Sequence, residues 1–120
     1  MKNKKNKPFD LRLGFALSGF IVAIKQENSF RFQVIAAIVA IALLAIVQPA
    51  PVWWALVIIA IVMVLAAELF NTALEVLCDY VQPEHHEVIG KIKDIAAAAV
   101  LVTSVGSLII AVLLLVDLIN

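Results

Sequence analysis

The sequence predicts an all-α membrane protein in which three transmembrane helices follow an N-terminal amphipathic helix on the membrane surface. Of its 120 residues 64% are hydrophobic, and the mean hydropathy is +1.08. A soluble globule of this size cannot bury so much apolar surface, because its surface is large relative to its volume. Three apolar stretches are also long enough to cross a hydrocarbon core of ~30 Å.

The charge and cysteine content exclude several classes of function. The formal net charge is zero, which argues against a nucleic-acid partner. The single cysteine, Cys78, cannot form an internal disulfide. No internal repeat divides the chain, so we expect one membrane domain over residues 1–120.

Residues 1–29 form the predicted N-terminal tail and surface helix. The first seven residues carry four lysines, which suit anionic lipid headgroups. The following segment is mostly apolar but contains Asp10, Arg12 and Lys25, which favours a helix lying in the membrane interface. A signal peptide is the alternative, and the arginine inside its apolar core argues against it.

The first membrane helix is predicted over residues 30–48 and the second over residues 52–80. Asn28 or Ser29 is suited to cap the first of these helices. Two prolines between the helices each disfavour helix in the preceding residue, so they predict a tight turn. The two tryptophans that follow match the aromatic belt of a membrane–water boundary.

The third membrane helix is predicted over residues 95–117. Pro83 ends the second helix and can open a short helix before the third. Basic residues lie in the N-terminal tail and in the 79–94 loop, whereas the turn between the first two spans has none. The N-terminus is therefore predicted to be cytoplasmic and the C-terminus to lie outside.

One stripe of the second helix carries the polar residues Glu68, Asn71, Glu75 and Asp79, while the other faces are apolar. On a soluble helix such a stripe would simply face water. Here an uncharged run starts at Val52, and at about 1.5 Å per residue the helix leaves the hydrocarbon core near residue 72. Glu68 is then about one turn inside the membrane. Ionisable groups at that depth are costly and usually mark a functional site.

This polar set could support phosphoryl transfer to a lipid hydroxyl, which needs chiefly positioning and charge neutralisation. Glu27 and Glu75 offer oxygen ligands near one membrane boundary, and Mg²⁺ takes one or two carboxylates together with phosphates and waters. Lys93 can contact phosphate, and Gly90 permits a close backbone approach. Glu68 lies deeper, where bulk water competes less, and can act as a general base.

Several of these residues have a plainer interpretation. Glu27 lies between Lys25 and Arg31 and suits a surface ion pair equally well. Lys93 beside Asp94 is a pattern that is more often simply solvated.

Two other kinds of site are disfavoured. His85, His86 and Cys78 could bind zinc, but their spacing matches no standard zinc pattern. The phosphate-binding loop and the catalytic motifs of soluble kinases are absent from the sequence.

Three sequence blocks resemble the small bacterial integral-membrane diacylglycerol kinases and the related undecaprenol kinases. Residues 67–75, AELFNTALE, match the family pattern E-[IL]-x-N-[ST]-A-[IL]-E. A second block runs from His86 through Gly90 to Lys93-Asp94, and a third covers residues 19–31. The similarity extends over roughly residues 14–116.

The resemblance implies an ATP-dependent kinase of a lipid alcohol in the bacterial cytoplasmic membrane. It also implies a homotrimer with active sites shared between neighbouring subunits at the cytoplasmic face. By the same resemblance, Glu68 and Asn71 are the catalytic residues, and Glu27 and Glu75 bind Mg²⁺. The ATP contacts that it implies are Arg12, Phe15, Glu27, Glu75, Glu84, His85, His86, Gly90, Lys93 and Asp94.

The chain departs from this family in its N-terminal helix. Phe15 stands where some members have a tyrosine, so a hydroxyl contact is lost. Pro8 stands in place of an early arginine, and Arg12 could substitute for it about one turn later. These departures affect the N-terminal half of the ATP site and leave the chemistry intact.

The lipid itself is not specified by any residue. Diacylglycerol and undecaprenol both present a primary hydroxyl at headgroup level, and we favour diacylglycerol as the substrate and phosphatidic acid as the product. An alternative from another class is an oligomeric membrane scaffold or channel whose polar stripe lines a pore. The clustering of the acidic residues at one membrane face argues against a pore.

Overall fold

The computed structural model describes residues 6–120, and within this range it contains four α-helices and no strand. These helices are α1 (Phe9–Gln26), α2 (Asn28–Val47), α3 (Pro51–Val81) and α4 (Glu87–Ile119). The last three are each long and apolar enough to cross a membrane, which confirms the predicted all-α class with three membrane helices. Lys2, Lys4 and Lys5, which we expect to meet lipid headgroups, lie outside the described residues.

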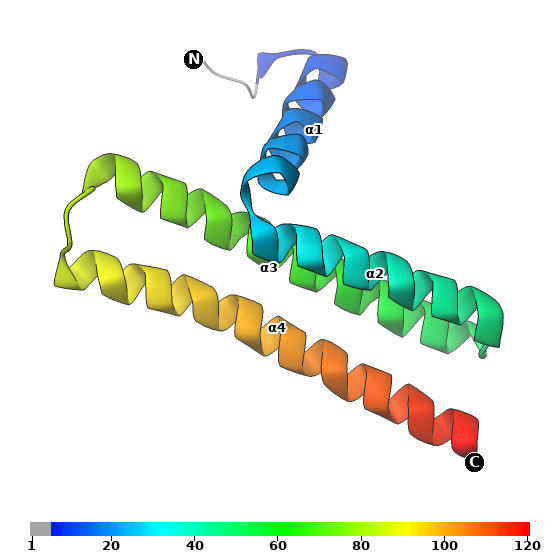
Figure 1. Ribbon diagram of the computed structural model, residues 1–120. Helices are drawn as coiled ribbons and strands as arrows, with labels where there is room; N and C mark the ends of the chain where they lie inside the picture. The colour runs from blue at the N-terminus through cyan, green and yellow to red at the C-terminus, as the bar shows by residue number, and fades with distance from the viewer. Residues whose placement is uncertain (1–5) are drawn as a thin grey trace.

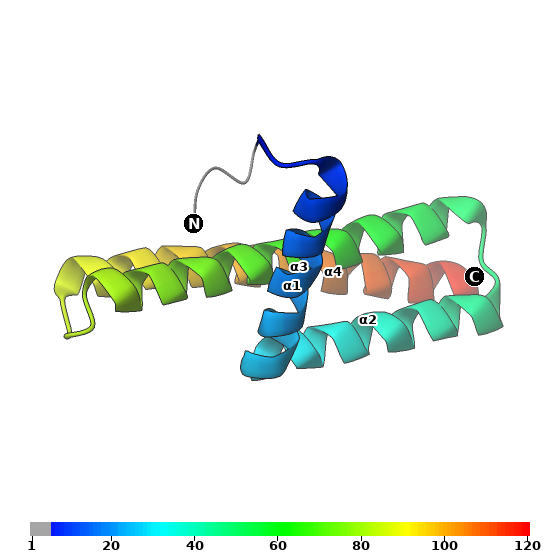
Figure 2. The same cartoon turned by 90° about the horizontal axis from the view of Figure 1, so that it is seen from above.

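The three long helices lie side by side, and α1 leaves them at a steep angle (Figure 1). Seen from above, α1 crosses over α3 (Figure 2). α3 contacts each of the other three helices, and its contact with α4 is the most extensive. α3 is therefore the central element of the chain.

A single residue, Glu27, separates α1 from α2. Its backbone is extended, with φ −113° and ψ 112°, so it ends α1 and redirects the chain. Phe30, just after this joint, is completely buried. Its ring meets the ring of Phe20 on α1 edge-on, with the centroids 5.1 Å apart, a favourable aromatic geometry that helps to hold the two helices together.

At the opposite end of the long helices, the turn predicted from the two prolines joins α2 to α3. Gln48 ends α2 in the left-handed conformation, with φ 52°, and Pro51 is the first residue of α3. Close by, Trp53 Nε1 donates a hydrogen bond to Asp117 Oδ2 at 2.9 Å. This bond joins the start of α3 to the end of α4.

The segment between α3 and α4 differs from the prediction. We expected a short helix opening at Pro83, but residues 82–86 are not helical. α4 then begins at Glu87, about two turns before the predicted third span, and continues unbroken for 33 residues. His86 Nδ1 accepts a hydrogen bond from the backbone N–H of Val88 at 3.1 Å and so caps this helix.

The single chain leaves much apolar surface uncovered. Most large apolar side chains of the three long helices are exposed. These helices also border an apolar groove of about 530 Å³ that extends from Gln33 near the start of α2 to Leu118 near the end of α4. Such surfaces suit contact with lipid chains or with another protein chain.

Candidate active site

The most deeply buried charged side chain in the described residues is Glu68 of α3, which is only 4% exposed. Both of its carboxylate oxygens accept hydrogen bonds from α2. Ser29 Oγ donates to Oε1 at 2.5 Å, and Gln33 Nε2 donates to Oε2 at 3.4 Å. The bond from Ser29 is therefore the shorter of the two. The two donors offset part of the cost of burying the charge.

Sequence reasoning did not find these two donors. We expected Asn28 or Ser29 to cap α2, but no side chain caps this helix, and Asn28 Oδ1 accepts from Arg31 instead. Ser29 and Gln33 are four residues apart and therefore share one face of α2. That spacing of two polar residues at the start of an otherwise apolar span is the signal that could have identified them.

A second polar contact lies one to two turns further along the same face of α3. Asn71 Nδ2 donates to Glu75 Oε1 at 3.4 Å. Asn71 is 8% exposed, and its Oδ1 atom is buried without a hydrogen-bond partner within the described residues. A buried acceptor of this kind is available to a group that the single chain does not supply.

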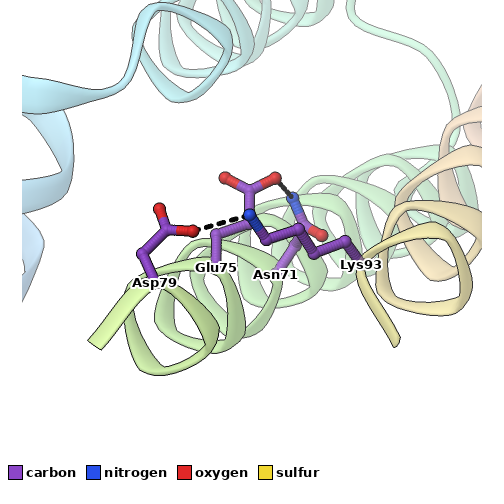
Figure 3. Close-up of polar contacts among 4 residues, drawn as sticks. All are labelled: Asn71, Glu75, Asp79 and Lys93. Carbon is purple, nitrogen blue, oxygen red and sulfur yellow. Dashed lines mark hydrogen bonds and ion pairs between the residues drawn. The ribbon is translucent and has the colours of Figure 1, made fainter. Parts of the chain in front are cut away.

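A third contact joins α3 to α4 about one turn beyond the second, toward the C-terminal end of α3. Lys93 reaches across from α4, and its Nζ lies 2.6 Å from Asp79 Oδ1, as Figure 3 shows beside the Asn71–Glu75 pair. It is the one ion pair among residues 6–120. Lys93 therefore pairs with Asp79 of α3, in an ion pair that itself lies at the surface. The four polar residues of the α3 stripe thus form three tiers, with Glu68 at the base.

The level of these tiers along the helices bears on their chemistry. Glu68 meets α2 in its first turn, where α1 joins it. α3 continues for 13 residues beyond Glu68, which is about 20 Å. Asn71, Glu75 and Asp79 occupy this extension, with the first turns of α4 alongside (Figure 1). Glu68 therefore lies at the level of the α1–α2 joint, and the other tiers project past it.

The remaining candidate residues lie around these tiers. Glu27 is half-buried at the α1–α2 joint, two residues before Ser29. Arg12 and Phe15 occupy exposed positions on α1. Three residues lie exposed in the segment between α3 and α4: Glu84, His85 and His86.

Two more candidates belong to the start of α4. Gly90 has open space beside it, because a Cβ atom there would meet nothing within 4 Å. Asp94 is exposed, and Lys93 beside it is half-buried and paired as described above.

The sequence raised two possible metal sites, one for zinc and one for Mg²⁺. Within the part of the chain that the structure describes, no three His, Cys, Asp or Glu side chains gather closely enough to form a metal site by themselves. Cys78 and the two histidines therefore do not form the zinc cluster considered above. Glu27 and Glu75 have half-buried carboxylates, the kind of hard oxygen ligand that Mg²⁺ takes when substrate phosphates and waters fill its other positions. Within residues 6–120 no hydrogen bond or ion pair joins Glu27 to Glu75, which instead contacts Asn71.

The contacts of Arg31 bear on the plainer interpretation of Glu27. Arg31 donates to the backbone carbonyl of Lys25 at 3.3 Å and to Asn28. Among residues 6–120, Glu27 has no ion pair with either of these basic residues. Its carboxylate is not committed to a surface ion pair.

Comparison with known proteins gives consistent matches. A family model for prokaryotic diacylglycerol kinase matches residues 14–115. The diacylglycerol kinase of Escherichia coli is 28% identical over 96 residues, which cover 80% of this chain and 79% of that protein. The diacylglycerol kinase of Haemophilus influenzae is 32% identical over 88 residues, 73% of this chain and 75% of that protein. The diacylglycerol kinase of Pseudomonas aeruginosa is 33% identical over 86 residues, which cover 72% of this chain and 70% of that protein. The range matched by the family model includes every candidate residue except Arg12.

Proposed function

The chain belongs to the prokaryotic diacylglycerol kinase family and is a lipid kinase, and we propose that it transfers the γ-phosphoryl group of ATP to diacylglycerol to give phosphatidic acid. The observation that carries the proposal is the buried Glu68 carboxylate, held by two donors at the level of the α1–α2 joint. Membership of a kinase family favours this function over the alternative that the sequence left open, a membrane scaffold or channel.

In the proposed reaction, Glu68 is the general base. It accepts the proton of the lipid hydroxyl while the hydroxyl oxygen attacks the γ-phosphorus and ADP leaves. Burial supports this role, because a lipid hydroxyl can approach the carboxylate at a level where bulk water competes little. Asn71, one turn away, is proposed to orient Glu75 through its Nδ2 and to offer its Oδ1 to the substrate.

Mg²⁺ and ATP are proposed to bind between the α1–α2 joint, which carries Glu27, and the part of α3 that projects past Glu68. Glu27 and Glu75 would hold the metal, which neutralises phosphate charge and orients the phosphates when bound. Lys93, whose ammonium group Asp79 holds against α3, is suited to contact phosphate. The remaining proposed nucleotide contacts are Arg12, Phe15, Glu84, His85, His86, Gly90 and Asp94.

We place this site at the cytoplasmic face of the bacterial cytoplasmic membrane. Basic residues lie in the N-terminal tail and in the first two turns of α4, at Lys91 and Lys93, whereas the turn between α2 and α3 has none, which favours a cytoplasmic position for both. α1 would then lie on the membrane surface beside the lipid headgroups, with many of its apolar side chains exposed to the bilayer. ATP would approach from the cytoplasm and the lipid from within the bilayer.

A direct assay tests the proposed reaction and its substrate. The purified protein in mixed micelles receives labelled ATP and Mg²⁺, with diacylglycerol and undecaprenol offered side by side. We expect label in phosphatidic acid, with kcat/KM for diacylglycerol at least about tenfold higher, which is a difference of about 1.4 kcal/mol. Micelles without either lipid are the control. A preference for undecaprenol would show that diacylglycerol is not the preferred substrate. Label in neither lipid would contradict the proposed reaction.

We also propose that the protein is a homotrimer, as the family resemblance implies. The exposed apolar faces and the apolar groove support an assembly of several chains. Native mass spectrometry of protein released from micelles should give three times the 13.0 kDa mass of one chain. A mass of one or two chains would contradict the trimer.

A further inference from the structure

Ser29 makes the shortest contact to the buried carboxylate, and it does so from a different helix. Its Oγ atom donates to Glu68 Oε1 at 2.5 Å across 39 residues of sequence. The ordinary role of a serine in the first turn of a helix is to cap that helix. The α2 N-terminus has no side-chain cap hydrogen bond, so the hydroxyl of Ser29 serves Glu68 instead.

The two oxygens of Glu68 are held unequally. Oε1 accepts the short bond from Ser29, whereas Oε2 accepts only a long contact of 3.4 Å from Gln33 Nε2. A hydrogen bond weakens as its distance increases, so the contact at Oε2 is the easier one to replace. The acceptor Oε1 atom of the same glutamine is buried without a partner within the described residues. The polar environment on the Oε2 side is therefore incomplete until another group enters.

We propose that Ser29 is a positioning residue that fixes the Glu68 carboxylate through Oε1, so that Oε2 is the atom that takes the proton from the lipid hydroxyl. The lipid O–H bond breaks, its proton moves to Oε2, and the lipid oxygen bonds to the γ-phosphorus as the bond from phosphorus to the leaving ADP oxygen breaks. The hydroxyl enters on the side of Gln33, whose free Oε1 can accept from a second group of the lipid. This inference rests on the proposed function, because it assumes that Glu68 is the base.

The physical effect of Ser29 is orientation. A glutamate side chain has several rotatable bonds, and a base that is not held in one geometry spends part of its time misaligned with its substrate. Losing the short bond should therefore lower kcat and leave KM for the lipid and for ATP almost unchanged, because the role proposed for Ser29 is to hold the base rather than to bind either substrate. A residue that only stabilised the fold would lower the apparent kcat by reducing the amount of folded, assembled enzyme, so each rate is expressed per assembled enzyme.

The test uses two variants of nearly identical shape at this position. Ser29→Thr keeps the hydroxyl, and Ser29→Val replaces it with a methyl group in the same branched side chain. We expect Ser29→Thr to retain most of the wild-type kcat and Ser29→Val to lose about tenfold, with both KM values within about twofold of the wild type. Ser107→Ala is the matched control, because its hydroxyl donates to the backbone carbonyl of Thr103 within α4. It should leave kcat unchanged.

The outcomes separate this inference from the proposed function. If Glu68→Gln is inactive but Ser29→Val equals Ser29→Thr in kcat, the positioning role is wrong and the general base stands. If Glu68→Gln keeps wild-type activity, the general base itself is wrong. A shape-related folding defect would affect the Thr and Val variants alike, and native mass spectrometry would detect loss of the assembly. If both variants lose part of their assembly, the ratio of the Ser29→Thr and Ser29→Val kcat values, each per assembled enzyme, still decides the role of the hydroxyl.

Discussion

Replacing Glu68 by glutamine should reduce lipid phosphorylation by about 10³-fold, within the range that general-base catalysis contributes. The amide has nearly the same size, and its oxygen can still accept the bond from Ser29. It cannot accept a proton from the lipid hydroxyl. Initial rates in mixed micelles at saturating ATP and lipid measure the loss.

The controls for this prediction separate chemistry from structure. Glu68→Gln should bind Mg·ATP with unchanged affinity and should retain its helical circular dichroism and its native mass. Asp10→Asn makes the same chemical change at an exposed position on α1 and should retain the wild-type rate. Loss of assembly in Glu68→Gln would instead identify Glu68 as a structural residue.

The second large effect is expected at Glu75. Glu75→Gln removes one of the two proposed metal carboxylates but leaves an oxygen that can accept from Asn71. We expect kcat/KM for Mg·ATP to fall by at least about 100-fold, because removing a metal ligand should cost no less than losing one of the outer-shell groups that orient such a ligand, which costs about 10- to 100-fold. The measurement is a Mg²⁺ titration of the initial rate at fixed ATP. The half-saturating Mg²⁺ concentration should rise.

This Mg²⁺ dependence distinguishes Glu75 from Glu68. In the Glu75 variant, part of the lost rate should return at high Mg²⁺, whereas no Mg²⁺ concentration should restore Glu68→Gln. Asp10→Asn again serves as the control and should keep the wild-type titration curve. If Glu75→Gln gives the wild-type titration curve, Glu75 is not a metal ligand.

The sequence was sufficient to predict the architecture because the length of an apolar run is itself the physical requirement for crossing a bilayer. It was less informative at the edges of the runs. The α4 helix begins eight residues before the predicted span because its first two turns carry four charged residues, Glu87, Lys91, Lys93 and Asp94, although they are helical. Capping by the side chain of His86 begins the helix well before the apolar run.

In the candidate site, the stripe on α3 follows from helical periodicity alone, since all four polar residues belong to one element. The contacts between helices could not be predicted in the same way. Ser29 and Gln33 mark one face at the start of α2, but the rest of the helix is apolar on nearly all sides, so its sequence does not indicate which helix that face meets. The pairing of Ser29 and Gln33 with Glu68 depends on that packing, and the Lys93–Asp79 pair depends on how the chain turns between α3 and α4.

The single-residue joint between α1 and α2 has a mechanical consequence. Glu27 is the whole connection, so the two helices cannot change their mutual angle without rotating the backbone at the residue whose carboxylate is proposed to hold the metal. If α1 lies among the lipid headgroups as proposed, crowding or thinning of that layer would tilt α1. The tilt would change the backbone angles of Glu27 and so move its carboxylate.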